Sequence, residues 1–441
     1  MTESSPSATP APPGRPPPPR AGEALPGHAL VAHTFPLEDP GPLLRLLPEH
    51  DITAWVHRGE GLVGWGTAAV IRPHGAGRFA QARRWWAELT RSAVVRDEVR
   101  HPGTGLVCFG SFAFADDPGG SVLVVPEVVV GRRGDLCWVT TIGRASLPSL
   151  PRVVPVEPGD GPSPVTFSDG ATSGTEWERI VSGAVRRIND GMLEKVVLAR
   201  DLVATCDGPV DVRWPLRRLA DSYPMCWTFH VDGLFGATPE MLVRRERGLV
   251  TSRVLAGTIR RTGDDAHDLA LAATLARSSK DLEEHEYAVR SVAEALAPHC
   301  TSMNVPESPF VLHLPNVMHL ATDVAGVAEN SDARTTTSLD LAEALHPSAA
   351  VGGTPTEAAK ALIAEIEGMD RGRYAGPVGW MDAVGDGEWG IALRSGQLDL
   401  DRRHTVRLFA GCGIVADSDP AAELAEAQAK FVPVRDALTS P

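Results

Sequence analysis

Residues 374–399 read YAGPVGWMDAVGDGEWGIALRSGQLD, and this stretch decides the fold class. Two strand-like segments, 374–384 and 388–399, flank the turn sequence Gly-Asp-Gly, which is the pattern of a β-hairpin. A hairpin pairs its strands antiparallel, and further strand-like runs alternate irregularly with helical ones along the chain. The sequence therefore predicts an α+β fold with large antiparallel sheets rather than a parallel βαβ array.

Helical periodicity is clearest in residues 175–191, TEWERIVSGAVRRINDG, where apolar side chains recur on one face. Thr175 and Glu178 fit a capping box there, and Gly191 fits a C-terminal stop. Further helices are predicted near 264–277, 280–298, 338–345, 355–367 and 420–438. The last two open with Thr354-Pro355 and Asp419-Pro420, a capping residue followed by proline in the first turn.

The composition argues against several classes of protein. A formal net charge of -14 over 441 residues does not suit a nucleic-acid-binding protein, which would show a basic face. The six cysteines form no CxxC pair and no zinc-ligand spacing, which favours reduced thiols in the cytosol. The sequence has neither a long apolar run nor a signal-peptide pattern. We expect a cytoplasmic protein without nucleic-acid or membrane partners, which captures any anionic substrate with local cations.

The chain divides by composition. Residues 1–27 are rich in Pro, Ser and Ala, and we expect a disordered tail because they offer too little apolar surface to bury. Residues 28–160 alternate short strand-like runs with glycine turns, and they form the N-terminal part of the predicted fold. Residues 157–173 are predicted as a loop or linker. The segment 174–439 carries the motifs that bear on chemistry.

Lys195 stands at the head of the apolar strand-like run in LEKVVLAR, residues 193–200. An ammonium at the edge of a buried strand is costly unless something uses it, although an edge lysine that reaches solvent is the alternative. Glu240 follows a predicted strand in GATPEMLV, where alone it would be a turn residue.

Two acidic pairs lie on predicted helices. Asp281 and Glu284 are spaced i,i+3, and Glu423 and Glu426 repeat the arrangement, with Lys430 one turn further along the same face. Two helices that point such pairs at each other would form an all-oxygen site suited to Mg²⁺. Solvated helix faces are the alternative reading.

Other polar positions sit where strands break or alternate. A strand that ends at Gly411-Cys412-Gly413 would expose backbone N–H groups to an anion, unless the glycines form only a tight bend. Gly257 and Thr258 end a second strand in the same manner. Arg394 alternates along the strand after the hairpin turn, where it would suit a carboxylate or a structural ion pair. His319 alternates within another strand, as a core histidine also could.

The order of these motifs resembles the chorismate-utilising enzymes, a family that includes isochorismate, salicylate, anthranilate and aminodeoxychorismate synthases. The similarity covers roughly residues 175–438 strongly and continues more loosely upstream. It rests on eight ordered motifs: KVVLAR, FGATPEML, LAGTIRR, SKDLEEHEYAV, VMHLATDV, LHPSAAVGGTP, RGRYAGPVGWMDAVGDGEWGIALRSG and LFAGCGIVADSDPAAELAEAQAKF.

The resemblance implies a single large domain whose antiparallel sheets enclose the site, with helices packed outside and Mg²⁺ as cofactor. By this resemblance Glu284 and Glu426 are metal ligands, with Asp281 and Glu423 beside them or acting through water. Lys195 would be the general base and Glu240 the general acid. The substrate pocket would comprise Gly257, Thr258, His319, Ala350, Tyr374, Arg394, Gly411, Gly413 and Lys430.

Two positions indicate the branch of the family. Members that add ammonia resemble this strand with Gln in place of Lys195, and members that use water have Lys. Salicylate-forming members tend to show Thr then Ala where this chain has Ala350 and Val351. The resemblance therefore implies the Mg²⁺-dependent conversion of chorismate to isochorismate for menaquinone or siderophore synthesis. We expect no glutaminase subunit, and we expect a monomer. A salicylate synthase is the main alternative, and an ammonia-using synthase or a non-catalytic ligand-binding member are others.

Overall fold

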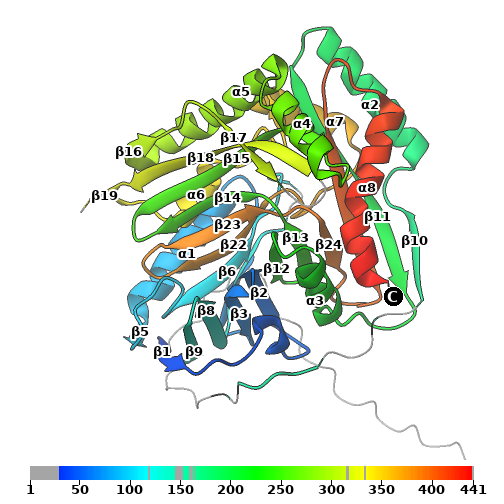
Figure 1. Ribbon diagram of the computed structural model, residues 1–441. Helices are drawn as coiled ribbons and strands as arrows, with labels where there is room; N and C mark the ends of the chain where they lie inside the picture. Colours follow the sequence, from blue (N-terminus) through cyan, green and yellow to red (C-terminus); the bar gives the residue numbers. More distant parts are fainter. Residues whose placement is uncertain are drawn as a thin grey trace, which may run out of the picture.

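The computed structural model describes residues 29–117, 120–144, 151, 153–157, 161, 164–313, 317–331 and 334–439. The predicted tail, residues 1–27, lies outside this part of the chain. Two large sheets dominate the architecture, with helices on their outer sides (Figure 1). Of the strand pairs found in the described residues, only β1 with β5 is parallel, so the predicted α+β fold with antiparallel sheets in one domain is confirmed.

The first sheet has 13 strands and spans both halves of the chain. Its N-terminal strands join its C-terminal ones where β2 pairs with β12. In sheet order the strands are β10 (Val165–Asp169), β11 (Lys195–Cys206), β25 (Thr405–Ile414), β24 (Ser395–Leu398), β13 (Leu234–Thr238), β12 (Trp227–Val231), β2 (Ile52–His57), β3 (Glu60–Trp65), β8 (Val128–Arg133), β9 (Leu136–Arg144), β1 (Leu30–Leu37) and β5 (Val94–Asp97), while β21 (Gly353–Thr354) pairs with β11.

The second sheet has 10 strands and carries the predicted hairpin. Its β22 and β23 pair antiparallel around a turn in which Asp382 N donates to Asp386 O over 2.8 Å. In order the strands are β16 (Cys300–Asn304), β18 (Val317–Ala328), β15 (Leu249–Arg260), β14 (Met241–Glu246), β23 (Gly387–Ile391), β22 (Pro377–Asp382), β6 (Val107–Ser111), β7 (Val122–Val125) and β4 (Ala69–Ile71), while β17 (Phe310–His313) pairs with β18. A separate ribbon joins β19 (Asn330–Ser331) to β20 (Arg334–Thr335).

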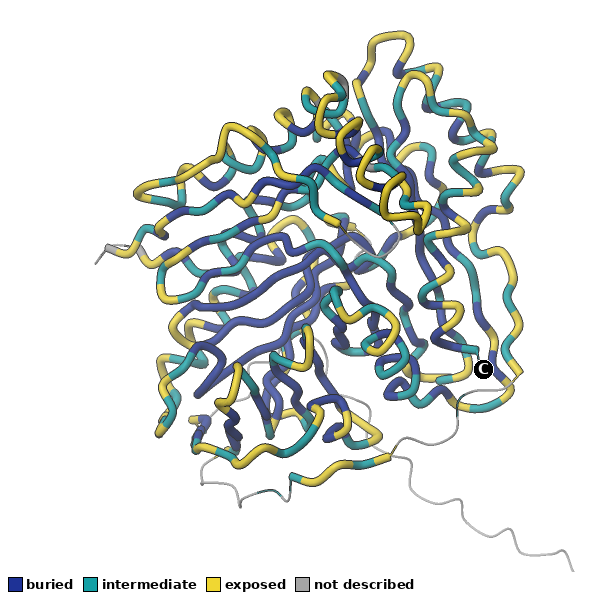
Figure 2. The backbone as a smooth tube through the Cα atoms, viewed as in Figure 1, coloured by how far each residue is buried: buried dark blue, intermediate teal, exposed yellow. Residues whose placement is uncertain are grey.

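The helices cover the sheets and leave a buried core between the layers (Figure 2). Helices α2 and α8 pack on β11 and β25 of the first sheet, and α5 packs on β15 and β18 of the second. All six helices predicted from the sequence are present. The helices are α1 (Arg78–Ser92), α2 (Gly174–Asn189), α3 (Arg213–Ser222), α4 (Asp265–Leu275), α5 (Ser279–Leu296), α6 (Ser338–Ala344), α7 (Thr356–Ile366) and α8 (Pro420–Leu438), with short 3-10 turns at Leu43–Arg45 and Ala297–His299. None of the described helices is long and apolar enough to cross a lipid bilayer.

Two predicted caps are wrong and one is confirmed. Helix α2 is capped by Ser173, whose hydroxyl accepts from Glu176 N, and not by Thr175, which lies inside the helix. Thr354 does not cap α7, because its backbone is extended in β21 opposite Lys195. Asp419 does cap α8, accepting from Ala422 N over 2.8 Å. Gly191 follows α2 with φ +79°, as its role as a stop requires.

Three strand boundaries also differ from prediction. Part of the predicted linker 157–173 forms β10, which pairs with β11 and is the edge strand of the first sheet. The strand at Gly411–Gly413 does not end there, because β25 continues to Ile414 opposite Val196. Arg394 is not in a strand: its φ is +48°, and it lies between β23 and β24. Local alternation could not show this, because the chain there leaves one sheet and enters the other.

Two such passages between the sheets position the centre of the molecule. The chain passes from β13 in the first sheet to β14 in the second through Pro239 and Glu240, and it returns from β23 to β24 through 392–394. The passages bind each other: Ile391 N donates to Glu240 O over 3.0 Å, and Ala237 N donates to Arg394 O over 3.3 Å. Glu240 and Arg394 therefore lie at the junction of the two sheets.

Candidate active site

Glu240 is the electrostatic centre of the junction. Burial of its carboxyl raises the pKa to about 7, although three nearby cations, those of Arg394, Lys195 and Lys430, favour the ionised form. Desolvation therefore outweighs attraction to three positive charges. A carboxyl of this pKa exchanges protons at neutral pH, as the prediction of a raised pKa and a general-acid role requires.

Lys195 enters the same junction from the first residue of β11. Its backbone pairs with Thr354 of β21, and the next residues pair with the end of β25. The side chain runs across Gly413: a Cβ at Gly413 would lie 3.0 Å from Lys195 Cε and 3.7 Å from its Nζ. Only a residue without a side chain leaves this path open, so the strand partner at Gly413 shapes the position of the amine.

A buried ion pair holds the strand that carries Lys195. Arg371 donates to Glu367 Oε2 over 2.6 Å, and the side chains are only 3% and 1% exposed. The same carboxylate accepts from Ala199 N, and Arg371 donates to Val197 O over 2.6 Å and to Val351 O over 2.9 Å. This pair joins β11 to the segment after Ala350. This ion pair was not predicted, although the i,i+4 spacing of the two residues was a signal.

The predicted carboxylate pair of α8 lies in a cluster beside β25. Ligand atoms of Glu423, Glu426 and Cys412 lie within 4.8 Å of one another. Lys430 Nζ donates to Glu426 Oε1 over 2.7 Å and to Gly411 O over 2.8 Å, and Ser418 Oγ donates to Glu423 Oε1 over 2.8 Å. Burial first, and then the neighbouring Glu426, raise the pKa of Glu423, while Ser418 opposes them. Cys412 was not predicted in this cluster, since no spacing pattern marks it.

The second predicted pair lies on α5, against a bulge in β15. Gly257 has φ +72°, where the pairing of β15 with β18 shifts by one residue. A Cβ at Gly257 would lie 3.2 Å from Asp281 Cβ, so the bulge brings Asp281 close to the strand. Nothing is described of the side chains of Thr258 and Glu284. The meeting of the two acidic pairs stays a prediction.

His319 faces the same bulge and is not a source of charge. Its pKa is lowered, first by burial and then by the cations of Arg394 and Lys430, while a hydrogen bond with the Gly257 backbone opposes this. The imidazole is therefore neutral at pH 7. It lines the region that contains both cations, where the sequence analysis placed it.

Arg394 and Tyr374 lie close to each other in the same region. The sequence left open whether Arg394 forms a structural ion pair. Among the described residues, no carboxylate forms an ion pair with Arg394. Tyr374 stacks on Phe409, with ring centroids 5.1 Å apart, and burial raises the pKa of its hydroxyl. Beyond Phe409, the only described partner of β25 is β11, because β24 begins opposite Phe409. One edge of Gly411–Gly413 therefore faces Lys430 rather than another strand.

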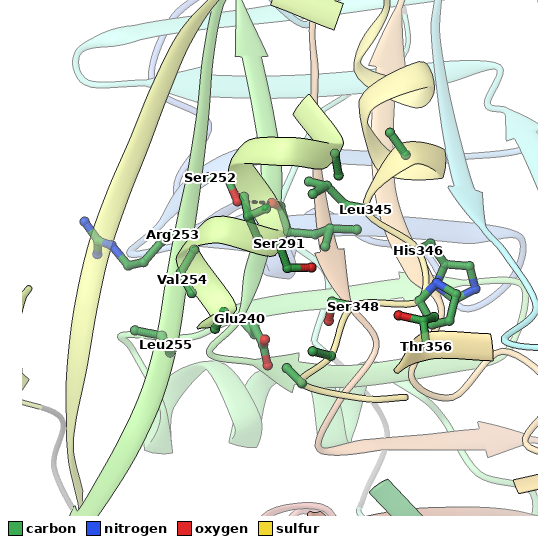
Figure 3. A pocket seen from close by; sticks show the side chains of 18 of the residues that line it. Glu240, Ser252, Arg253, Val254, Leu255, Ser291, Leu345, His346, Ser348 and Thr356 are labelled. Carbon is green, nitrogen blue, oxygen red and sulfur yellow. Dashed lines mark hydrogen bonds between the residues drawn. The ribbon is translucent and has the colours of Figure 1, made fainter. Parts of the chain in front are cut away.

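Ala350 lies on the other side of Glu240. The two residues line a cleft of about 310 Å³ together with α5, α7 and the strands β14 and β15 (Figure 3). Ala350 is exposed within it, whereas Val351 is 3% exposed. The structure thus places Lys195, Arg394 and Lys430 close enough to Glu240 to act on its charge, and His319 close to Arg394 and Lys430. Ala350 lies on the cleft that Glu240 also lines.

This arrangement is suited to a small dianion. Arg394, Lys430 and Lys195 supply positive charge in a protein of net charge -14, while Glu240 provides a carboxyl that can be protonated at neutral pH. An amine and a carboxylic acid in one site permit removal of a proton at one atom and delivery at another.

Comparison with known proteins agrees with this chemistry. The family model described as chorismate binding enzyme matches residues 50–146 and 158–439. The isochorismate synthase MenF of Bacillus subtilis is 38% identical over 267 residues, which cover 60% of this chain and 55% of the relative. The salicylate biosynthesis isochorismate synthase of Pseudomonas aeruginosa is 33% identical over 452 residues, covering 95% of this chain and 92% of the relative.

A solved structure gives the same result. The menaquinone-specific isochorismate synthase MenF from Escherichia coli superposes with a TM-score of 0.75 at 25% identity, covering 94% of this chain and 95% of the other. The matched residues include the whole junction between the sheets. The chain belongs to the family of chorismate binding enzymes.

Proposed function

We propose that this protein is an isochorismate synthase, which converts chorismate to isochorismate by adding water at C2 and releasing the C4 hydroxyl. The observation that carries the proposal is the proximity of the Lys195 amine to the Glu240 carboxyl, which has a pKa of about 7. Water addition needs a base at one ring carbon and an acid at another, and these two groups meet that need. The names of relatives that match over most of the chain support the same activity.

The mechanism assigns one proton to each group. Lys195 removes a proton from water as the oxygen bonds to C2. The two conjugated double bonds shift along the ring, and the C4–O bond breaks. Glu240 gives its proton to the departing oxygen, which leaves as water. No electron is gained or lost, so the reaction needs no redox cofactor or nucleotide.

The cations of the site hold the substrate in place. Chorismate carries two carboxylates, and we assign their binding to Arg394, Lys430 and the open backbone edge of Gly411–Gly413. A planar guanidinium can bind a carboxylate through two hydrogen bonds, which fixes the ring as well as its charge. Gly257, His319 and Tyr374 limit the space around it.

The residues present fit Mg²⁺. Glu423 and Glu426 provide hard oxygen ligands, and the pKa of Glu423 is raised first by burial and then by the neighbouring Glu426 carboxylate, which a bound cation would offset. We assign Glu284 and Glu426 as ligands, with Asp281 and Glu423 beside them or acting through water. Bound there, Mg²⁺ would hold the ring carboxylate and stabilise charge that develops in the ring.

The product identifies the reaction directly. The purified protein is incubated with chorismate with and without Mg²⁺, and the products are separated by chromatography. We expect isochorismate only with the metal. Salicylate as the product would favour the salicylate synthase alternative, in which pyruvate elimination follows.

Lys195→Gln tests the choice of water as nucleophile. The variant should lose isochorismate formation by about 10²–10⁴-fold, because a base is removed, while chorismate still binds in calorimetry. Near-normal turnover of the variant would contradict the assignment. A wild-type protein that makes an aminated product when ammonium salts are added would favour the ammonia-using alternative.

A further inference from the structure

The cleft beside Glu240 joins the site to the surface. Strands β14 and β15, helix α5, the start of α7 and residues 344–350 line it (Figure 3). The side chains of Arg253, Glu357 and Lys360 stand at its outer part and are 41%, 86% and 38% exposed. Its 310 Å³ leave room for several water molecules, at about 30 Å³ each.

One polar group in the wall is left for water to satisfy. Ser348 Oγ is buried and, among the described residues, has no hydrogen-bond partner. Buried hydroxyls without a protein partner are usually bonded to ordered water. Two other polar groups of the wall are engaged elsewhere: Ser252 Oγ donates to Leu242 O over 2.7 Å, and the His346 ring bonds Phe114 O over 3.0 Å.

His346 does not carry protons through the cleft. Burial lowers its pKa to about 4, so the ring is neutral at pH 7, and its Nε2 is held by the Phe114 carbonyl. Ser348 is therefore a buried group of the wall whose hydroxyl is left to hold a water between Glu240 and solvent. Its hydroxyl can accept one hydrogen bond and donate another.

The proposed reaction creates the need for such a route. After each turnover Glu240 has lost a proton, Lys195 has gained one, and a new water molecule occupies the place of the C4 hydroxyl. Before the next turnover that water must leave, Glu240 must take up a proton, and Lys195 must release one. The cleft opens on the Glu240 side of the site and is not lined by Lys195 or Arg394.

We propose that the cleft is the exit of the displaced water and the path by which Glu240 regains its proton, with a relay water held by Ser348 Oγ. This inference rests on the proposed function, because only departure of the C4 hydroxyl makes Glu240 the proton donor. Ser348 is a positioning residue here, since it acts through water.

Ser348→Ala tests the relay, because its hydroxyl binds no described protein group and the fold should be retained. The first turnover uses the proton already on Glu240, so the rate with enzyme in excess over chorismate should be unchanged. The steady-state kcat should fall about tenfold, with KM unchanged, because later turnovers wait for a proton. Rapid-quench measurements should then show a burst of one product per active site. Ser182→Ala, whose hydroxyl bonds Glu178 O in α2, is the control.

Filling the cleft provides an independent test. Ala288→Leu places extra bulk in the wall from α5, while Ala293→Leu makes the same change at a position of α5 that does not line the cleft. The first variant should show the burst and the reduced kcat, and the second should resemble the wild type. A formate or imidazole buffer that restores kcat in Ala288→Leu would further support proton supply as the slow step.

Other results would overturn the inference. Equal falls of the single-turnover and steady-state rates would mean that the changes disturb the chemical step. A raised KM without a burst would mean that chorismate enters through the cleft. Unchanged kinetics in Ser348→Ala and in Ala288→Leu would mean that the cleft has no role in turnover. The wild-type assay separates these results from failure of the proposed function, since that failure would abolish isochorismate formation before any variant is compared.

Discussion

Glu240 is the residue whose ionisation should be visible in the activity. Its pKa is raised by burial to about 7, so the acid form predominates below that pH and falls about tenfold for each unit well above it. We expect a bend near pH 7 in the profile of kcat/KM, which reports the free enzyme. Infrared spectra should show the carbonyl band of a protonated carboxyl that disappears as pH rises through the same value.

Glu240→Gln is the matching variant, since the amide keeps the shape and cannot donate as an acid. Activity should fall by about 10²–10⁴-fold, and both the bend and the infrared band should vanish. A bend that survives in Glu240→Gln would assign the ionisation to another group. Chorismate binding, measured by calorimetry, serves as the control for the fold.

Individual chemical residues were predictable from the sequence, but their surroundings were not. Lys195 and Glu240 stand beside strand-like runs, where local pattern is informative, and the structure brings them together. Arg394 was placed in a strand because the alternation of side chains continues through it, whereas the chain leaves one sheet there. The path of Lys195 across Gly413 depends on the pairing of β11 with β25, strands about two hundred residues apart, and no local pattern encodes it.

At the scale of elements, helices were predicted more closely than strand ends. All six expected helices form, because apolar spacing and caps are local signals. β10 was hidden in a segment rich in Gly, Pro and Ser, and Thr354 was assigned to a cap because pairing with Lys195 arises only in the folded chain. Edge pairing competes with such local signals and overrides them.

The pairing of β11 with β25 yields a prediction for Gly413→Ala. The added methyl would lie 3.0 Å from Lys195 Cε, and the flexible side chain must move aside. We expect the free energy of unfolding to change by less than about 1 kcal/mol, because the displaced atoms are mobile. The kcat should fall at least tenfold, because about 1 Å of misplacement of a catalytic group can cost 10²-fold.

Gly208→Ala is the matched control for that prediction, because a Cβ at Gly208 would meet nothing within 4 Å and its backbone does not require glycine. Both variants are compared by thermal unfolding and by initial rates with chorismate. Normal turnover of Gly413→Ala would show that the position of Lys195 does not depend on this strand partner.

At the scale of the whole molecule, both sheets depend on both halves of the chain. In the first sheet β12 pairs with β2, and in the second β22 pairs with β6. The aromatic side chains of Trp55 and Phe109, from the N-terminal half, are 1% and 0% exposed in the shared core. Residues 174–439 carry the predicted catalytic motifs, but the two sheets that position the site also contain strands from the N-terminal half.

We therefore expect the fragment 164–441 not to fold by itself. Without residues 29–157, the fragment would expose strands in the middle of both sheets and would lack core side chains such as that of Trp55. Loss of one buried aromatic side chain alone costs about 3–5 kcal/mol. The chain 29–441 keeps every described strand and should unfold in a single calorimetric transition like the full chain. The fragment should show no cooperative thermal transition by circular dichroism. A monomeric fragment with a sharp transition and bound chorismate would mean instead that the C-terminal segment is a separate domain.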